Sequence, residues 1–475
     1  MADIKEECGV FGLFAENTTD VSSIVYRGLY ALQHRGQESC GITVNDDGVF
    51  STYKDLGLVC DVFSADNLKA LGKGNMAIGH VRYATTGTND RNNAQPIVVN
   101  HSKGRMALAH NGNLTNSYEL RCEFEENGSI FHTTSDTEVI SYTITQERIK
   151  SKSIEEAVCK TMYRLKGAYS LLVMSPAKMI AVRDKHGFHP LCYGEMSDGT
   201  YIVASESCAL DSVGAKFIRD IKPGEIVIFS KDGIKSIEEH CDTVPKSTCV
   251  FEYIYFARPD SVIDGVSVHN ARVKAGEYLY EEQPTDADVV IGVPDSGLDA
   301  AVGYSKRSGI PYEIGLIKNK YIGRTFISPG QDNRLNQVRI KLNPLKSVVD
   351  GKRIVLIDDS IVRGTTCAQI VKLLREAGAA EIHMRISAPP FLHPCYYGTD
   401  IDSEENLISS HHSVEEVAKI VGADSLVFLS IENTKKLALT QTNDGFCTAC
   451  FDGKYPTEIP KFTQKSRFEN KISEG

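Results

Sequence analysis

One segment near the middle of the second half restricts the fold more than any other part of the chain. Ile354–Ile357 is an unbroken apolar run that ends in two adjacent carboxylates, Asp358 and Asp359. The loop that follows contains Gly364-Thr365-Thr366 and leads into a helical pattern that reaches Arg375. A buried strand followed at once by a loop and a helix is the repeating unit of a parallel α/β sheet. The segment therefore predicts such a sheet, with polar groups at the end of the strand.

The two halves of the chain have different patterns. In the second half, further strands are expected at Ala287–Val293 and Glu381–Ala388, alternating with helical stretches. The first half has short apolar runs with no helices between them, which favours antiparallel sheet. These runs are Ala168–Ser175, Met179–Arg183 and Thr200–Ala204, and helices are expected at Val21–Gln33 and Thr134–Ile149. A boundary is expected in the charged stretch Ser230–Lys246.

Composition limits the class of protein. A length of 475 residues suggests two or three domains, and a net charge of −10 argues against nucleic-acid binding as the main role. No run reaches the ~18 apolar residues of a membrane span, and the polar N-terminus is no secretory signal, so a cytoplasmic protein is expected. The 13 cysteines are scattered and odd in number, so some of them are expected to do chemistry or to bind metal instead of forming disulfides.

A set of short motifs marks the first half. Cys8-Gly9 lies almost at the start of the chain, where a single cysteine is more often a small buried apolar residue than a nucleophile. Four further segments occur in order, at residues 33–38 (QHRGQE), 80–87 (HVRYATTG), 109–114 (AHNGNL) and 134–138 (TSDTE). Together with Cys8-Gly9 they closely resemble the N-terminal-nucleophile glutaminase domain of the class II glutamine amidotransferases. That resemblance implies an α+β domain with stacked antiparallel sheets between helices.

The resemblance also implies roles for individual residues. Cys8 would be the nucleophile, with its own α-amino group, whose pKa is ordinarily ~7.7–8, as the base. Asn111 and the Gly112 N–H would form the oxyanion hole. Arg82 would bind the glutamine α-carboxylate and Asp136 the α-ammonium, although a surface ion pair and a plain helix cap are the simpler alternatives. Arg35, Gly36 and Thr85 complete the expected glutamine site.

Seven residues precede Cys8 in the printed sequence. Removal of the initiator methionine alone cannot expose the Cys8 amine that this chemistry needs. Some members of the family are made with a short N-terminal propeptide ahead of the cysteine, and residues 1–7 resemble one.

The acidic segment introduced first resembles the phosphoribosyl pyrophosphate (PRPP) motif of type I phosphoribosyltransferases. A helix N-terminus favours a phosphate, and adjacent carboxylates can bind ribose hydroxyls and help to hold Mg²⁺ together with substrate oxygens. Residues 318–326 resemble the loop that closes over PRPP, although a basic surface loop is the simpler alternative. The resemblance assigns to PRPP Asp295, Ser296, Lys318, Arg324, Asp358, Asp359, Ser360, Arg363, Gly364, Thr365 and Thr366, with Ser296, Asp358 and Asp359 at the Mg²⁺.

The cysteines of the second half form a further candidate site. Cys447 and Cys450 are a C-x-x-C pair, whose spacing alone fits half a zinc site or a redox pair equally well. With Cys249 and Cys395 they resemble the ligands of one subgroup of amidophosphoribosyltransferases, which holds a [4Fe–4S] cluster. Zinc and no metal are the alternatives.

The resemblance to the amidophosphoribosyltransferases covers nearly the whole chain, from Cys8 to about Cys450. It implies a propeptide (1–7), a glutaminase domain (8–240), a phosphoribosyltransferase domain with a parallel sheet (241–453) and a C-terminal tail (454–475). The expected reaction, a pentosyl transfer, converts glutamine, water and PRPP to phosphoribosylamine, glutamate and pyrophosphate for purine synthesis. The family also implies a homo-oligomer, a dimer or a tetramer, inhibited by purine nucleotides. Rival interpretations are another class II amidotransferase, such as a glucosamine phosphate synthase or asparagine synthetase, and a PRPP-sensing protein without catalysis.

Overall fold

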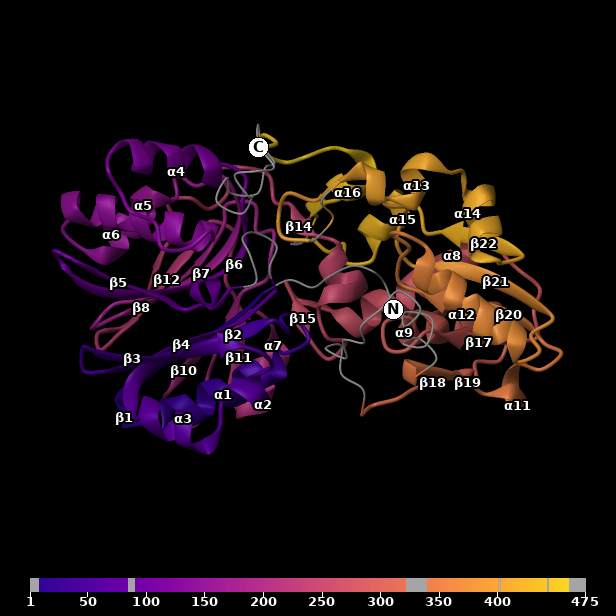
Figure 1. Ribbon diagram of the computed structural model, residues 1–475, viewed down its shortest axis with the longest axis horizontal. Helices are drawn as coiled ribbons and strands as arrows, with labels where there is room; N and C mark the ends of the chain where they lie inside the picture. Colours follow the sequence, from indigo (N-terminus) through magenta and orange to yellow (C-terminus); the bar gives the residue numbers. More distant parts are fainter. Residues whose placement is uncertain are drawn as a thin grey trace, which may run out of the picture.

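The computed structural model describes residues 8–83, 90–321, 340–399, 401, 403–441 and 444–460. The chain forms two lobes side by side, the first from the indigo-to-magenta part of the sequence and the second from the orange and yellow part (Figure 1). Residues 1–7, with the expected propeptide, and Thr85 and Arg324 of the expected sites lie outside the described residues.

Two antiparallel sheets build the first lobe. Within the described ranges, one sheet has seven strands in the order β11 (Lys216–Asp220), β9 (Cys192–Glu195), β10 (Tyr201–Ala204), β1 (Gly9–Thr19), β4 (Gly74–Arg82), β2 (Ser39–Asp46) and β3 (Val49–Leu56). The other has six strands, in the order β13 (Gly233–Ile237), β12 (Ile226–Ser230), β8 (Met179–Arg183), β7 (Gly167–Met174), β6 (Gly104–Leu114) and β5 (Ile97–His101). The antiparallel pairing confirms the prediction for this half.

The two sheets stack face to face with helices on their outer faces. Residues of both sheets, such as Val10, Ile78 and Leu172, pack together in one buried cluster between the sheets. On the outer side of the seven-stranded sheet lie α1 (Val21–Ala31), α2 (Val59–Val62), α3 (Ala65–Leu71) and α7 (Ser207–Val213). Helices α4 (Ser117–Glu126), α5 (Asp136–Lys150) and α6 (Ile154–Thr161) cover the six-stranded sheet. This four-layer arrangement is the α+β glutaminase fold that the motifs predicted, and it explains why central strands such as β4 and β7 are buried on both faces.

A parallel sheet forms the centre of the second lobe. Its described strands run in the order β17 (Val289–Gly292), β20 (Arg353–Asp358), β21 (Glu381–Ile386) and β22 (Ser425–Phe428). Alternate residues of β20 point to opposite faces, so Val355 and Ile357 pack with α8 (Val268–Glu282) and α9 (Leu298–Ser308). Ile354 and Leu356 pack with α12 (Thr365–Glu376) and α14 (Val414–Val421). The expected parallel α/β domain is therefore confirmed, with helices on both faces.

The remaining described elements of the second lobe lie at its edges. They are β14 (Thr248–Cys249), the π-helical turn η2 (Glu252–Phe256), β15 (Val262–Ile263), β16 (Val266–Ser267), β18 (Leu316–Lys318), β19 (Leu342–Pro344), α11 (Lys346–Val349), η3 (Glu404–Asn406), α13 (Ile408–His411), α15 (Ile431–Lys436), β23 (Phe446–Cys447) and α16 (Ala449–Asp452). Strand β14 pairs in parallel with β23, so the start and the end of the second half meet.

The junction between the lobes falls within the expected charged stretch. Strand β13 still belongs to the six-stranded sheet, whereas β14 belongs to the second lobe. The first residues of the expected C-terminal tail contact both lobes, because Tyr455 donates a hydrogen bond to Pro394 O and Lys166 pairs with Glu458. Among the described residues, no helix has both the length and the apolar character needed to cross a bilayer.

Candidate active sites

Cys8 lies at the beginning of β1, in the middle of the seven-stranded sheet. Gly9, the first residue of the strand, pairs with Val81 of β4. The Cys8 side chain is 8% exposed, and its thiol donates to the Tyr83 carbonyl oxygen with the sulfur at 3.4 Å. A strand inside a sheet holds its end firmly, so the thiol has a fixed position beside the end of β4.

Arg82 and Gly36 lie at the same end of the sheet. Arg82 is the last residue of β4 and is 2% exposed, so it is not the surface ion pair of the simpler alternative. A Cβ atom on Gly36 would lie 2.6 Å from the Val81 carbonyl carbon, so only glycine allows this segment to pack against β4. Arg82 thus lies within the group of predicted glutamine contacts.

Asn111 and Gly112 lie on β6 of the other sheet. His80 of β4 bonds through Nε2 to the His110 carbonyl oxygen at 2.9 Å, which ties the two strands together. Asn111 is completely buried, yet neither its amide nitrogen nor its amide oxygen has a hydrogen-bond partner among the described residues. Such an unsatisfied buried amide costs free energy, and it fits a group that waits for an oxyanion.

Gly112 has a conformation that few other residues adopt. Its φ is 135°, and a Cβ atom there would lie 2.3 Å from the Ala168 carbonyl oxygen. Glycine is therefore required beside Asn111. The predicted pair of oxyanion donors consequently lies on a stretch of strand whose conformation is specified by the sequence.

Asp136 begins α5, but it does not cap the helix. Ser135 is the N-cap, and its hydroxyl accepts from the Thr137 N–H. Asp136 instead accepts from the Leu114 N–H at 3.0 Å and lies 3.5 Å from His110 Nδ1. Burial would raise the pKa of Asp136, but His110 and the Leu114 N–H outweigh it and lower that pKa. A buried, ionised carboxylate suits the predicted contact with an ammonium group.

Arg35 differs from its predicted role as a glutamine ligand. Its side chain is fully buried, and its guanidinium pairs with Glu206 and Glu252. Its Nε donates to the Cys8 carbonyl oxygen at 3.0 Å. The guanidinium therefore has no face open to a substrate, and a glutamine contact stays a prediction only for the backbone of this segment. Sequence reasoning missed Glu206 and Glu252 because neither belongs to a motif.

Asp358 and Asp359 lie at the carboxyl end of β20, as predicted. Both are fully buried, with Asp359 accepting from Ser296 Oγ at 2.7 Å and from the Ser360 hydroxyl. Burial, and then the neighbouring Asp359, raises the pKa of Asp358 to about 8. Two buried carboxylates side by side attract a cation, which can also contact the oxygens of a bound ligand. This is the chemistry expected of an Mg²⁺–PRPP site.

Two loops border the acidic pair. The loop after β17 contains a cis Pro294–Asp295 peptide, and Lys318 of β18 forms an ion pair with Asp295. A Cβ atom on Gly297 would lie 2.4 Å from the Ile357 carbonyl oxygen, so glycine lets this loop pack against β20.

The other loop leads into α12. Gly364 is its N-cap, with φ 77°, and Thr365 and Thr366 form its first turn, where backbone N–H groups favour a phosphate. Arg363 is exposed beside them. The structure thus brings the described PRPP residues together around one strand end.

Cys249, Cys395, Cys447 and Cys450 line one cavity at the junction of the lobes. Cys249 is paired with Cys447 across β14 and β23, and Cys450 follows in α16. Cys395 reaches the same cavity, whose other walls are mainly apolar and aromatic. The Tyr397 N–H donates to Cys395 Sγ at 3.4 Å. Burial raises the pKa of Cys447 to about 12 and that of Cys450 well above its ordinary value.

The thiols at this cavity are not gathered around one point. The only described group of Cys, His, Asp and Glu ligand atoms within 4.8 Å of one another is Cys159, Glu239 and His240 in the first lobe. No three of the sulfur atoms of Cys249, Cys395, Cys447 and Cys450 therefore lie within 4.8 Å of one another. In the first-lobe group, His240 Nε2 bonds to the Cys159 carbonyl oxygen at 2.8 Å. This histidine therefore already supplies a hydrogen bond to a backbone carbonyl group in the last turn of α6.

Comparison with known proteins agrees with the fold of both lobes. The glutamine amidotransferase domain family matches residues 80–212, and the phosphoribosyl transferase domain family matches residues 270–409. An amidophosphoribosyltransferase of Bacillus subtilis is 49% identical over 97% of this chain and 96% of its own length. One from Methanocaldococcus jannaschii is 48% identical over 95% of this chain and 98% of its own length.

Solved structures give the same result. The glutamine PRPP amidotransferase of B. subtilis, complexed with ADP and GMP, is 48% identical with a TM-score of 0.89 and covers 97% of this chain and 100% of its own. A structure described as the allosteric regulatory enzyme of purine biosynthesis has 47% identity and a TM-score of 0.90, and covers 98% of this chain and 100% of its own. The phosphoribosyl transferase match accounts for the second lobe. The rival interpretations, a glucosamine phosphate synthase with a sugar-isomerase domain or an asparagine synthetase with a synthetase domain, are therefore not needed. The chain belongs to the amidophosphoribosyltransferase family.

Proposed function

We infer that this chain transfers the amide nitrogen of glutamine to C1 of PRPP, with phosphoribosylamine, glutamate and pyrophosphate as products. This reaction is the first committed step of purine synthesis. The observation that carries the inference is contact between the first candidate site and the second lobe. Asn113 Nδ2, two residues after Asn111, donates to the Tyr396 carbonyl oxygen of the second lobe at 2.9 Å. A Cβ atom on Gly398 would lie 3.7 Å from Gly112 Cα, so the two lobes meet at the oxyanion strand.

In the first site, we propose that Cys8 attacks the glutamine amide carbon as its thiol proton passes to the Cys8 α-amine. The Asn111 amide and the Gly112 N–H donate to the oxyanion, and its collapse releases ammonia and leaves a thioester. Water then attacks the thioester carbon, which returns the thiol and releases glutamate. Arg82 and Asp136 orient the substrate by its α-carboxylate and α-ammonium. This scheme needs an exposed Cys8 amine, so residues 1–7 are proposed to be removed as a propeptide.

In the second site, ammonia attacks C1 of the ribose and the C1–O bond to pyrophosphate breaks. Asp358 and Asp359 bind the ribose hydroxyls, and the first turn of α12, with Arg363, Thr365 and Thr366, binds the 5-phosphate. Lys318 and Arg324 are proposed to neutralise pyrophosphate as it leaves. Mg²⁺, held near Ser296 and the two carboxylates, supplies further neutralisation of that charge. Ammonia is nucleophilic only when unprotonated, which favours direct passage between the touching lobes over release into water.

Activity with two nitrogen sources tests these assignments. Cys8→Ser should abolish glutamine use but keep most synthesis from ammonia, because the second site does not need the thiol. Cys60→Ser, a change at an exposed cysteine outside both sites, is the matched control and should keep both activities. Loss of both activities in folded Cys8→Ser protein would refute two separable sites. Intact-mass measurement should find active enzyme that begins at Cys8; active enzyme beginning at Met1 would refute the amine base.

We further propose that Cys249, Cys395, Cys447 and Cys450 hold a [4Fe–4S] cluster with a structural role. Support comes from their convergence on one mainly apolar cavity and from the N–H donated to Cys395 Sγ, a kind of contact that clusters receive. Protein purified without oxygen should contain iron and acid-labile sulfide, about four of each per chain. Cys450→Ser should lose both and unfold more easily, whereas Cys60→Ser should not. Stoichiometric zinc instead would favour a zinc site.

Other properties are proposed by relation to the family. Because a B. subtilis relative was solved with ADP and GMP, purine nucleotides are proposed to inhibit this enzyme, which assays with added GMP would test. A homo-oligomer, dimer or tetramer, is proposed, to be measured by light scattering. A cytoplasmic location is proposed because none of the 13 cysteines, all within the described ranges, is in a disulfide. The division at about residue 240 is proposed as the domain boundary.

A further inference from the structure

A buried charge network joins the backbone of Cys8 to the second lobe. Arg35 follows α1, and its side chain is fully enclosed. Its Nε donates to the Cys8 carbonyl oxygen at 3.0 Å. Its two terminal nitrogens both bond to Glu252, at 3.0 and 2.6 Å. One guanidinium therefore contacts the residue that carries the predicted nucleophile and, at its other end, a carboxylate of η2 in the second lobe.

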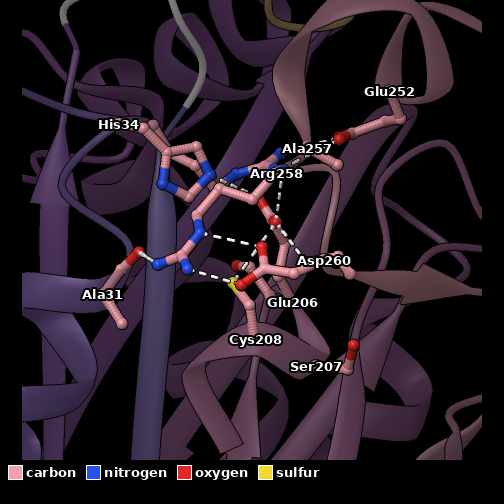
Figure 2. Close-up of polar contacts among 12 residues, drawn as sticks. Ala31, His34, Glu206, Ser207, Cys208, Glu252, Ala257, Arg258 and Asp260 are labelled. Atoms are coloured by element: carbon pink, nitrogen blue, oxygen red, sulfur yellow. Dashed lines mark hydrogen bonds and ion pairs between the residues drawn. The ribbon is translucent and has the colours of Figure 1, made fainter. Parts of the chain in front are cut away.

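A second carboxylate completes the surroundings of Arg35. Glu206, which precedes α7, accepts from Arg35 Nη1 at 2.7 Å and contacts His34 Nε2 at 2.7 Å. Its other oxygen accepts from the Arg258 N–H and from Ser261 Oγ of the second lobe. Figure 2 shows His34, Glu206 and Arg258 in one group of polar contacts, with Glu252 at its upper right. Although burial opposes ionisation, His34 and then Arg35 hold the pKa of Glu206 well below its ordinary value.

The network returns to the oxyanion strand through the second lobe. Glu252 Oε1 lies 3.3 Å from His189 Nδ1, and His189 Nε2 bonds to the Tyr397 carbonyl oxygen at 2.8 Å. The preceding residue, Tyr396, accepts from Asn113 on β6. Contacts from Glu252 therefore lead in one direction to Cys8 and in the other to the strand of Asn111 and Gly112. The nucleophile and its oxyanion donors are linked through residues of the other lobe.

We propose that Arg35 and Glu252 are positioning residues, through which the phosphoribosyltransferase lobe sets the placement of Cys8 against the oxyanion hole. The proposal rests on the assignment of Cys8 as nucleophile. The thiol and the α-amine belong to the same residue as the carbonyl that Arg35 binds, so a shift of Arg35 moves both reactive groups. Loss of the Glu252 charge leaves a buried guanidinium partly unpaired, and Arg35 then moves toward Glu206. A misplacement of about 1 Å can cost about a hundredfold in rate.

Glu252→Gln is the first test, because it keeps the shape and removes the charge. We expect kcat for glutamine hydrolysis to fall by about tenfold to a hundredfold. The KM for glutamine should change little, because Arg82 and Asp136 are untouched, and ammonia-dependent synthesis should persist. Alkylation of Cys8 by iodoacetamide, followed on its peptide by mass spectrometry, should slow by a similar factor. Glu252→Asp keeps the charge and should recover part of both rates.

The chain offers a matched control in a second buried ion pair between the lobes. Arg183 at the end of β8 bonds to Asp264, in the turn between β15 and β16, at 2.7 and 3.1 Å. Arg183 Nε also donates to the His189 carbonyl oxygen at 2.8 Å, a contact whose two partners Asp264→Asn leaves in place. No contact of this pair with Cys8, Asn111 or Gly112 is present among the described residues. Asp264→Asn also breaks a buried interface pair, so it should lower thermal stability as Glu252→Gln does. Its kcat for glutamine and its Cys8 alkylation rate should stay at the wild-type level.

The outcomes separate this proposal from the assignment beneath it. Glutaminase activity that survives Cys8→Ser would refute the assignment of Cys8 as the nucleophile. With that assignment intact, equal kcat values for Glu252→Gln and Asp264→Asn would refute the positioning role. Equal loss of glutamine-dependent and ammonia-dependent synthesis in Glu252→Gln would also refute it, because a general structural defect would then explain the result. If Glu252→Gln does not fold, an unchanged kcat and alkylation rate in Glu252→Asp refutes the proposal, and a fall in both supports it.

Discussion

Two pairs of buried carboxylates lie in different regions of this molecule and have opposite surroundings. At the interface between the lobes, Glu206 and Glu252 share the guanidinium of Arg35, with a histidine ring beside each carboxylate. At the end of β20, Asp358 and Asp359 lie next to each other, and their described partners are hydroxyl, thiol and backbone groups. Both pairs have lost their hydration, but among the described residues positive groups contact only the interface pair.

The difference distinguishes a structural charge pair from one that serves a ligand. A balanced pair is stable without any added ion, and removal of one partner leaves an uncompensated charge. An unbalanced acidic pair is held in place by the fold and gains from a cation that arrives with the substrate. Stability and activity should therefore respond in opposite ways when each pair is altered.

The largest expected effect is on catalysis. Asp358→Asn combined with Asp359→Asn should lower phosphoribosylamine synthesis by about a thousandfold, with glutamine or ammonia as the nitrogen source, because both routes share this site. Asp286→Asn, at an exposed position of the same lobe, should leave synthesis near the wild-type rate. Product formation measured with each nitrogen source checks this. Normal PRPP use by the double variant would refute the assignment of Asp358 and Asp359 to the PRPP site.

The next effect is on stability. Glu206→Gln should lower the free energy of unfolding by about 3–5 kcal/mol, because Arg35 and His34 lose a buried partner. Glu432→Gln, which breaks an exposed pair with Lys436, should change the free energy of unfolding little, because solvent screens exposed charges. Asp358→Asn without metal should stay within about 1 kcal/mol of wild type, since it relieves repulsion. Urea denaturation measures the free energy of unfolding for all three variants. Similar losses of that free energy for Glu206→Gln and Asp358→Asn would contradict the difference between the two carboxylate pairs.

A smaller effect should follow addition of magnesium. Mg²⁺ at a hundredfold excess over its Kd should stabilise the metal-free protein by about 2.7 kcal/mol, because it binds the folded site alone. Thermal denaturation should show this rise in wild type and in Glu206→Gln, but not after Asp358→Asn with Asp359→Asn. An equal rise in the double variant would place the cation elsewhere.

The smallest effect concerns pH. Because the folded-state pKa of Glu206 is lowered from an ordinary 4.5, its stabilisation is fully present above that pH and is lost as the pH falls below it. The stability difference between wild type and Glu206→Gln should thus shrink as the pH falls from about 5 to about 3. Unfolding free energies measured across this range test the sign. A difference that grows on acidification would contradict it.

Much of the fold followed from local patterns. The run Met179–Arg183 coincides with β8, and the apolar run Ile354–Ile357 lies within β20 (Arg353–Asp358). The helix expected to extend to Gln33 ends at Ala31, since the chain must turn there to bring Arg35 beneath Cys8. Apolar periodicity thus specified elements well, whereas tertiary contacts decided where they end.

The sites were predictable only where residues form short motifs. Cys8, Asn111 and Asp358 lie in such motifs, and the structure gathers the described members of each set. Glu252 and His189 have no distinctive neighbours in sequence, and their importance arises from contacts between lobes. Arg35 was placed among the glutamine ligands because its motif contains it, but burial gives its side chain another set of partners. Long-range ion pairs of this kind leave no periodic or spacing signal.

The pairing of β14 with β23 sets an order of events during synthesis of the chain. Cys249 leaves the ribosome about 200 residues before Cys447, which at about 5–20 residues per second is a delay of some tens of seconds. The first lobe has all of its strands by then and can fold while the rest is being translated. The cysteine cavity, in contrast, exists only after translation of Cys450. A ribosome stalled before Cys447 would therefore carry a folded glutaminase lobe beside a second lobe that still lacks two of the four cavity thiols.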